Sequence, residues 1–170
     1  MKKIFCILGV ISFLLVLYGY VSIPLPRVLI YNHTESIPIG WYLILPTHNY
    51  EVGDIVAFSA PKEAQKMALA RKWIREDDVM LKKIGALEGT KYVIDKNLQF
   101  YVDGNYIGPV YQADGEGRPM PVIRGEHIVK TGTFLPVTKN PSSFDGRYYG
   151  AVPLSEIEFK VVPILVRFYF

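Results

Sequence analysis

The sequence predicts a mainly β fold, with one antiparallel β domain placed behind a single N-terminal membrane-spanning helix. An almost unbroken apolar run extends from Ile4 to Ile23, and the chain beyond it alternates short β-rich runs with polar turns. The chain has 170 residues, of which 50% are hydrophobic. This is enough for one modest domain and an anchor, but too little for two full cores.

The apolar run predicts a transmembrane anchor over residues 4–23. About 20 residues rising ~1.5 Å each match the ~30 Å hydrocarbon layer of a bilayer. A cleaved signal peptide is the alternative, but its apolar core usually spans only ~7 to 15 residues. Tyr20 and Val21 also leave no clear small-residue cleavage site. We therefore expect an anchor that is retained.

The charges that flank the run predict its orientation. Lys2, Lys3 and the amino terminus outweigh Arg27 on the other side, and positive residues favour the cytoplasmic face. Residues 1–3 are therefore expected in the cytoplasm of a bacterial cell. Residues 24–170 are expected to form an extracytoplasmic (periplasmic) domain attached by one pass through the cytoplasmic membrane, with membrane lipid as a contact.

Composition excludes several other functions. The net charge of +3 is spread along the chain without a basic run, which argues against nucleic acid as a partner. Cys6 is the single cysteine, so no internal disulfide is possible. The histidines are isolated, with no spacing typical of metal ligands, and we expect neither a metal nor an organic cofactor. They are His33, His48 and His127.

Local patterns predict the elements of the domain. The β-rich runs are 40–45, 52–58, 79–94, a hairpin at 98–107, 127–135 and a closing strand at 157–170. Residues 62–74 have the composition of a helix or a mobile loop. Residues 114–121 are rich in Gly and Pro and predict a surface loop, and residues 140–153 predict a polar turn.

Ser36 is the first candidate for a catalytic residue. It lies in the first polar turn after the anchor, two residues before Pro38, and proline stiffens both its own position and the residue before it. Without a base a serine hydroxyl is a weak nucleophile, so a neighbouring base is required. No G-x-S-x-G elbow surrounds any serine, which disfavours a Ser-His-Asp hydrolase.

Lys82 is the candidate base. On a strand with a period of two, it shares one face with Met80 and Ile84, while Lys83 points to the other face. Burial among apolar side chains disfavours an ammonium ion and lowers the lysine pKa. A neutral Lys82 could then accept the Ser36 proton; the alternative is a lysine whose amine extends to water.

The turn at 140–153 combines hydroxyl, acidic, basic and aromatic side chains. Asp145 and Arg147 are positioned to form a charge-assisted pair that fixes the turn. The hydroxyl of Ser143 is a candidate hydrogen-bond partner for an amine.

These motifs, in this order behind an anchor, resemble the type I signal peptidase (leader peptidase) family of membrane-bound Ser-Lys proteases. Within that family, the chain is similar to the conjugal-transfer signal peptidases of the TraF type. The motifs are the Ser36 turn, the strand at 53–58, the Lys82 strand, the loop at 114–121, and the box Ser143-Phe144-Asp145-x-Arg147-Tyr148-Tyr149-Gly150-x-Val152-Pro153. Departures lie in turns, where Glu88-Gly89-Thr90 replaces the usual Pro-Gly-Asp.

The resemblance implies a role for each matching residue. Ser36 matches the nucleophile and Lys82 the general base. The Thr34 hydroxyl matches the group that joins the Ser36 N–H in the oxyanion hole. Ser143 matches the hydroxyl that orients the lysine amine, and Asp145 with Arg147 the supporting ion pair. The implied fold is a coiled, barrel-like antiparallel β-sheet with a small inserted cap region at roughly 95–130.

The implied activity is cleavage of signal peptides or pilin-like precursors at the outer face of the membrane, in conjugative transfer. The partners would be an exported precursor protein and conjugation or secretion machinery. Three alternatives stay open: a pilin cyclase or transpeptidase with the same chemistry, a general leader peptidase, and a non-catalytic anchored component of a secretion or conjugation apparatus.

Overall fold

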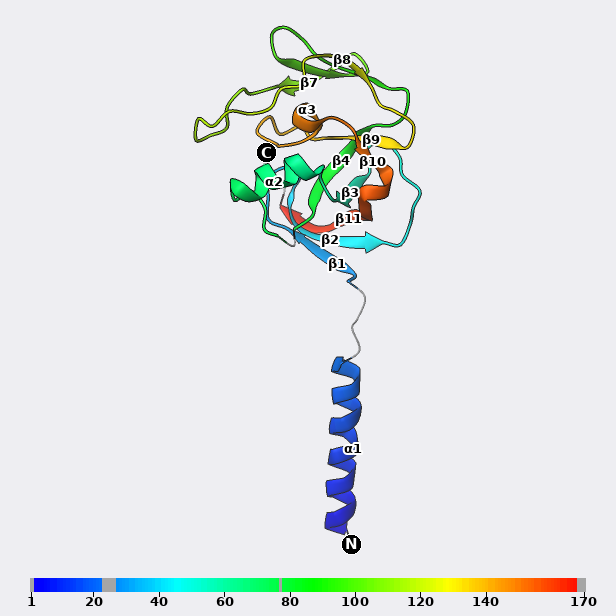
Figure 1. Cartoon of the computed structure of the whole chain (residues 1–170). Helices are drawn as coiled ribbons and strands as arrows, with labels where there is room; N and C mark the ends of the chain where they lie inside the picture. The colour runs from blue at the N-terminus through cyan, green and yellow to red at the C-terminus, as the bar shows by residue number, and fades with distance from the viewer. Residues whose placement is uncertain (1, 23–26, 77, 168–170) are drawn as a thin grey trace.

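The computed structural model describes residues 2–22, 27–76 and 78–167, so the predictions made for residues 1, 23–26, 77 and 168–170 lie outside this part. Helix α1 (Lys2–Ser22) precedes a domain that is mainly β. Figure 1 shows α1 apart from this domain. Among the described residues, no helix combines the length and the apolarity that crossing a bilayer requires. The anchor expected over residues 4–23 stays a prediction.

The main sheet has seven strands in the order β1-β2-β11-β3-β4-β9-β10, and every neighbouring pair is antiparallel. Three register shifts, in β11 and between β4 and β9, interrupt the regular pairing. Such irregularities increase local twist and help a long sheet to curl. The strands are β1 (Leu29–Asn32), β2 (Ile39–Leu45), β3 (Ile55–Phe58), β4 (Met80–Ala86), β9 (Thr133–Val137), β10 (Val152–Pro153) and β11 (Ile157–Arg167).

A second antiparallel sheet has the order β7-β6-β5-β8. Figure 1 shows it at the end of the domain farthest from α1, with β1 and β2 at the near end. Three of its four strands, β6, β7 and β8, lie in the region 95–130 that was expected as an inserted cap, and β5 directly precedes it. Its strands are β5 (Lys91–Ile94), β6 (Gln99–Val102), β7 (Asn105–Pro109) and β8 (Gly125–Ile128).

Three apolar clusters hold these elements together. One packs helix α2 (Lys62–Ala70) on the main sheet through Ala64 and Ala68. A second joins the two sheets, with Phe100 and Leu135 fully buried. The third lies beneath β1, where Tyr42 is fully buried. Helix α3 (Gly146–Tyr149) and the short 3₁₀ helix η1 (Leu154–Glu156) complete the chain before β11.

Several predicted boundaries were wrong. The run 79–94 is two strands in two different sheets, because a turn at 87–90 separates β4 from β5. The run 127–135 is likewise divided between β8 and β9. Residues 62–74 were expected to be a helix or a mobile loop, and the helix ends at Ala70. The strand expected over 52–58 begins at Ile55. The turn expected at 140–153 contains α3 and β10. In the runs 79–94 and 127–135 the local composition favours strands, but it does not reveal to which sheet each strand belongs.

Candidate active site

The turn after β1 presents Ser36, and Asn32 holds this turn in shape. Asn32 is 2% exposed. Its Nδ2 donates hydrogen bonds to the carbonyl oxygens of Thr34, Ile37 and Pro38, at 2.8, 3.0 and 3.1 Å. One buried amide therefore satisfies three carbonyls on both sides of the serine, and the Pro38 carbonyl also accepts the Tyr42 hydroxyl at 2.6 Å.

The oxygen of the same amide fixes Thr34. Asn32 Oδ1 accepts hydrogen bonds from the Thr34 backbone N–H at 3.1 Å and from Thr34 Oγ1 at 2.9 Å. Thr34 and Ser36 both line the same pocket. Thr34 is thus placed near the candidate nucleophile, with its hydroxyl proton directed at Asn32 in this state.

Lys82 approaches Ser36 from the interior of the domain. It is 5% exposed, and its Nζ donates a hydrogen bond of 2.5 Å to Ser36 Oγ. Burial lowers the pKa of Lys82 from 10.5 to about 8; the Asp145 carboxylate opposes this shift and the Arg147 guanidinium reinforces it. A substantial fraction of Lys82 is therefore neutral near pH 8, where the amine nitrogen is able to accept a proton.

The alternation within β4 explains how the lysine enters the interior. Met80, Lys82 and Ile84 are buried, whereas Lys83 is exposed. Pairing with β3 places Lys82 opposite Val56, which is fully buried. The backbone of a central strand thus directs Lys82 inward.

Ser143 and Asn140 connect the segment after β9 to the Ser36 turn. Ser143 is 3% exposed, and its Oγ donates a hydrogen bond to Ser36 Oγ at 3.3 Å. Asn140 Nδ2 donates to the backbone carbonyl of Glu35 at 3.0 Å. The expected role of Ser143, to orient the lysine amine, stays a prediction, because the hydrogen bond seen here runs to the serine.

Asp145 and Arg147 form an ion pair with both side chains completely buried. Arg147 Nε lies 2.9 Å from Asp145 Oδ1, and Arg147 Nη2 lies 3.2 Å from Oδ2. Burial raises the pKa of Asp145, while Arg147 and then Lys82 oppose that change. Asp145 also accepts the backbone N–H of Arg147 at 3.1 Å, where it caps α3, and that of Thr138 at 3.0 Å.

The remaining donors of Arg147 reach the end of β7 and the segment after β9. Its Nη2 donates to the carbonyl of Thr138 at 2.8 Å, and its Nη1 donates to those of Pro109 and Pro141, at 3.2 and 3.3 Å. The guanidinium also lies 5.7 Å from the centre of the Phe100 ring. Arg147 therefore links the second sheet to the segment that carries Ser143.

A pocket of about 320 Å³ lies beside Ser36. Its walls come from β1 with the turn that follows it, from Trp73, Ile74 and residues 78–82, and from the segments that hold Tyr111 and Phe144. Lys82 and Ser36 lie within this lining, together with Ile30, Val79, Leu81 and Met120. A mostly apolar pocket next to a serine and a buried amine is suited to hold part of a peptide during reaction at the serine.

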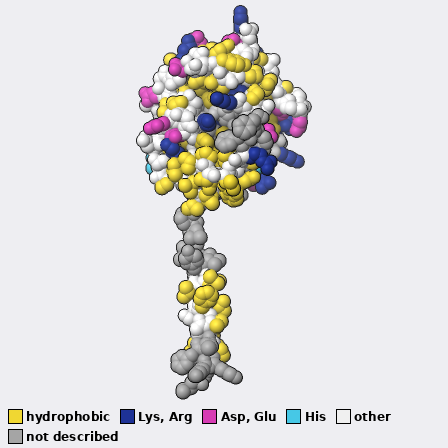
Figure 2. All heavy atoms as spheres, turned by 180° about the vertical axis from the view of Figure 1, so that it is seen from behind, with side chains coloured by type: hydrophobic (Ala, Val, Ile, Leu, Met, Phe, Trp, Pro, Cys, Tyr) yellow, Lys and Arg dark blue, Asp and Glu magenta, His cyan; other side chains and the backbone are white. Residues whose placement is uncertain are grey.

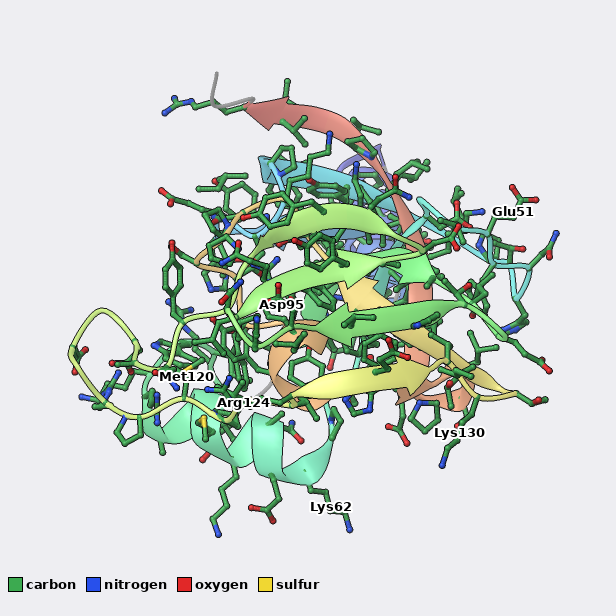
Figure 3. The ribbon with its side chains drawn as sticks, turned by 90° about the horizontal axis from the view of Figure 1, so that it is seen from above. Glu51, Lys62, Asp95, Met120, Arg124 and Lys130 are labelled. Atoms are coloured by element: carbon green, nitrogen blue, oxygen red, sulfur yellow. The ribbon has the colours of Figure 1, made fainter. Side chains whose placement is uncertain are left out.

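The loop at 114–121 forms one wall of this pocket. Arg71 at the end of α2 pairs with Asp114 at 2.9 Å and donates to the Pro119 carbonyl at 2.6 Å, and Arg118 pairs with the same aspartate at 2.7 Å. Figure 3 shows the labelled Met120 above the helix that begins at Lys62. The loop expected at the surface is thus attached to α2 through Arg71.

The geometry defines a class of site, one in which a serine hydroxyl is hydrogen-bonded to a buried amine. Nucleophilic hydrolases use such a pair to attack a carbonyl carbon. Within the described residues, no group of three or more His, Cys, Asp or Glu side chains is arranged to hold a metal ion.

The particular family follows from comparison with known proteins. The family model described as signal peptidase, peptidase S26, matches residues 1–166, so the chain belongs to this signal peptidase family. Membership supports a peptidase of the leader peptidase kind, with a precursor protein as substrate. No curated protein matches the chain. The narrower TraF-type assignment stays a prediction.

The structure brings all six expected site residues into one region, and it gives roles to two residues for which the sequence assigned none: Asn32, which belongs to the motif around Ser36, and Arg71. Asn32 organises the Ser36 turn, and Arg71 attaches the loop at 114–121. Asn32 is followed by a Thr34-x-Ser36-x-Pro38 pattern, in which a buried asparagine after a strand is typical of local backbone capping. No local signal marks Arg71, because its partners are more than 40 residues away.

Proposed function

We propose that this chain is a serine endopeptidase in which Ser36 is the nucleophile and Lys82 the general base. The observation that supports this assignment is the 2.5 Å hydrogen bond between Lys82 Nζ and Ser36 Oγ, made by a lysine whose pKa burial lowers to about 8. A base must lie within hydrogen-bond reach of the proton it removes, and its pKa must be near the working pH.

The reaction proceeds in two stages. Neutral Lys82 takes the proton as Ser36 Oγ attacks the scissile carbonyl carbon. The resulting ammonium group donates that proton to the leaving amine as the C–N bond breaks, which leaves an ester on Ser36. In the second stage Lys82 takes a proton from water, and the hydroxide attacks the ester carbonyl. The carboxylic acid is released, and the proton returns to Ser36 Oγ.

The oxyanion of each stage is stabilised by the Ser36 backbone N–H and by the Thr34 hydroxyl. Thr34 Oγ1 donates to Asn32 Oδ1 in the substrate-free state, so its proton turns to the oxyanion when substrate binds. Asn32 Oδ1 keeps the Thr34 N–H as a partner during this rotation. Loss of one such donor typically costs ~10²- to 10³-fold in rate.

Two strand edges beside the pocket favour an extended substrate. β1 is an edge strand of the main sheet, and β4 pairs with β9 only from Lys83 onward, so Met80 and Leu81 lack a β9 partner in the described pairing. Ile30 and Leu81, one from each strand, line the pocket. We propose that the part of the substrate before the scissile bond adds to these edges as a strand. The family resemblance implies small residues one and three places before the cut.

We also propose that the enzyme works at the outer face of the bacterial cytoplasmic membrane, with residues 4–23 as its anchor. Apolar side chains on β1, β2 and β11 face outward, and Figure 2 shows apolar side chains gathered at the end of the domain near α1. Trp and Tyr among them are typical of a membrane–water boundary. The exposed members are Leu29, Tyr31, Trp41, Leu43, Ile164 and Leu165.

The boxes at 114–121 and 143–145 support a pilin-like precursor in conjugative transfer as the substrate, since they carry the resemblance to conjugal-transfer peptidases. Cyclisation of such a precursor would use the same acyl-enzyme, with the substrate amine in place of water. Mass spectrometry separates the two outcomes, because the cyclic product is lighter by one water molecule.

The test compares Ser36→Ala and Lys82→Ala variants with wild type on a co-expressed precursor. Both variants should leave the precursor unprocessed while the chain remains folded, as judged by circular dichroism. In wild type, kcat/KM should rise with pH and reach half its maximum near pH 8, as Lys82 loses its proton. Full processing by either variant would refute the protease assignment and favour a non-catalytic component.

A further inference from the structure

A second and larger pocket opens on the other side of Ser36. Its volume is about 1020 Å³, against about 320 Å³ for the first, and Ser36 is the residue that both linings share. We propose that this pocket, the amine-side groove, binds the part of the substrate that follows the scissile bond and prefers acidic side chains there. Its lining includes Glu35, Val52, Lys83, Tyr106, Ile107 and Lys139. The proposal rests on the proposed function.

The two pockets are continuous through Ser36. A peptide whose carbonyl carbon meets Ser36 Oγ must continue away from the serine in both directions. The first pocket accepts one direction, and the amine-side groove begins at the same side chain. The groove is therefore placed to receive the other direction without any movement of the domain.

Strand edges decide which half of the substrate lies on which side. After the C–N bond breaks, the acyl half stays bound to Ser36 while the amine half departs. The first pocket has the open edges of β1 and β4, which supply backbone hydrogen-bonding groups to an extended chain. The acyl half is retained best there, so the amine half lies in the second pocket.

The walls of the groove are fixed by buried polar groups, which indicates a built site and not a surface irregularity. Thr138, 4% exposed, lines the groove and is held on both backbone sides, its N–H by Asp145 and its carbonyl by Arg147. Arg147 also holds the carbonyl of Pro109, two residues after Ile107, which lines the groove too. The ion pair therefore sets the separation of these two parts of the lining.

Charge gives the groove its chemical preference. Lys83 and Lys139 line it and are exposed, and within the described part of the chain neither makes a salt bridge. Glu35 is the single acidic residue of the lining. Pairing of β4 with β9 brings Lys83 opposite Val137, the last residue of β9, and Lys139 follows two residues later, so the two cations lie on adjacent segments. Carboxylates of an extended peptide are thus attracted to this wall.

Much of the remaining lining of the groove is apolar. Val52 is 61% exposed and Tyr106 is 56% exposed, and both line the groove together with Ile37 and Ile107. Apolar side chains left open to water favour an occupant that covers them. A peptide with acidic side chains and alternate apolar ones fits both features.

Acyl transfer to added amines tests the groove separately from the acyl pocket. The full-length enzyme receives one fixed peptide substrate together with a tripeptide amide, either Ala-Asp-Asp or Ala-Lys-Lys. The amine attacks the Ser36 ester, the C–N bond forms as the C–Oγ bond breaks, and the amine proton passes through Lys82 to Ser36 Oγ. Liquid chromatography then measures the ratio of ligated to hydrolysed product.

Wild type should give about fivefold more ligation with the acidic acceptor than with the basic one, the size expected of two exposed ion pairs. The Lys83→Glu/Lys139→Glu double variant should reverse this preference. Lys96→Glu, a charge change at an exposed lysine outside both pockets, should keep it.

Equal ligation of the two acceptors by wild type would overturn the proposal. A Lys96→Glu variant that changes the acceptor preference as much as the double variant does would also overturn it. The Lys83→Glu/Lys139→Glu variant could instead change the enzyme's selectivity only for substrate residues before the scissile bond. That result would place the acyl half of the substrate in this groove and would also overturn the proposal. Each result requires an enzyme that still cleaves the substrate. Failure of the proposed function is different, because no product of either kind would form in wild type.

Discussion

Lys82 meets Ser36 from the buried side of the sheet, with its Nζ 2.5 Å from the serine Oγ although 46 residues separate them in sequence. The amine is surrounded by the core, and its only described hydrogen bond is to the residue it would activate. Burial disfavours the charged form of the lysine. It therefore favours the neutral amine that the reaction requires, and it lowers the stability of the folded state wherever the unfolded chain would carry the charge.

This cost predicts that Lys82→Met stabilises the fold at neutral pH. The folded-state pKa of Lys82 is lowered from 10.5 to about 8, so between these values the unfolded chain holds a proton that the folded chain releases. Stability consequently rises with pH across this window, and the full cost, on the order of 3 kcal/mol, applies below pH 8. Urea unfolding at pH 7 should show the variant more stable by about 1–3 kcal/mol.

The difference between Lys82→Met and wild type should shrink as the pH rises from 8 and disappear above pH 10.5, where the lysine is neutral in both states. Lys83→Met is the matched control, since Lys83 is exposed on the same strand and should show little change at either pH. A Lys82→Met protein that is less stable than wild type at pH 7 would contradict the buried, uncharged state of the amine.

Ser143→Ala separates two roles for this hydroxyl. The hydrogen bond of 3.3 Å runs to Ser36 Oγ, so its loss should lower kcat by about 5- to 10-fold, the effect of one hydrogen bond of ~1 kcal/mol. The midpoint of the pH profile should stay near pH 8, because Lys82 keeps its surroundings. A clear shift of the midpoint would instead indicate that Ser143 orients the lysine. Ser155→Ala, at an exposed serine in η1, is the control.

Asn32→Asp tests the hydrogen bonds that shape the Ser36 turn. The substitution keeps the acceptor for Thr34 but removes the donor to three carbonyls, and it places a buried carboxylate against them. The carboxylate pKa should rise in the folded state, so stability falls as the pH rises above ~4. Thermal unfolding should therefore show a larger loss at pH 7 than at pH 4.

Asn32→Ala provides the comparison, because it should destabilise the fold by about 1–3 kcal/mol without this pH dependence. Asn49→Asp, at an exposed position, controls for the added charge. If Asn32→Asp were as stable as wild type at pH 7, the amide donor would not be needed to hold the turn.

The outward apolar face of β1, β2 and β11 predicts a dependence on membranes. A Trp41→Ser/Leu165→Ser double variant removes two paired exposed side chains, 43% and 71% exposed. Cleavage of a precursor embedded in lipid vesicles should fall several-fold, while cleavage of a short soluble peptide changes little. Ile128→Ser, at a residue 63% exposed in the second sheet, should affect neither assay. Equal loss in both assays would argue against membrane contact by this face.

Local pattern was sufficient to predict the mainly β class, and it placed Lys82 on an apolar strand face, but it left open whether the amine is buried or extends to water. The alternation of β4 distinguishes the buried Lys82 from the exposed Lys83, and this information lies within seven residues. The hairpin of β6 and β7 was also predicted, because its sequence has an Asp-Gly pair between two β-rich runs. In the structure Asp103 and Gly104 both have the positive φ that such a turn requires.

Pairing between distant segments was not predictable in the same way. The division of 127–135 into two strands depends on β8 pairing with β5 and β9 pairing with β4, and neither partner is local. Arg71 shows the same limitation at the site, since its role follows from Asp114 and Pro119, on a loop that only the folded chain brings near.

The buried Arg147 has a consequence for how this domain can be altered. Its guanidinium joins carbonyls from the second sheet and from the segment that carries Ser143. Exchange of the second sheet between relatives should therefore succeed only when residues 138–147 are transplanted with it. The second sheet and residues 138–147 should therefore be inherited and engineered as a single module, because Arg147 connects them by hydrogen bonds.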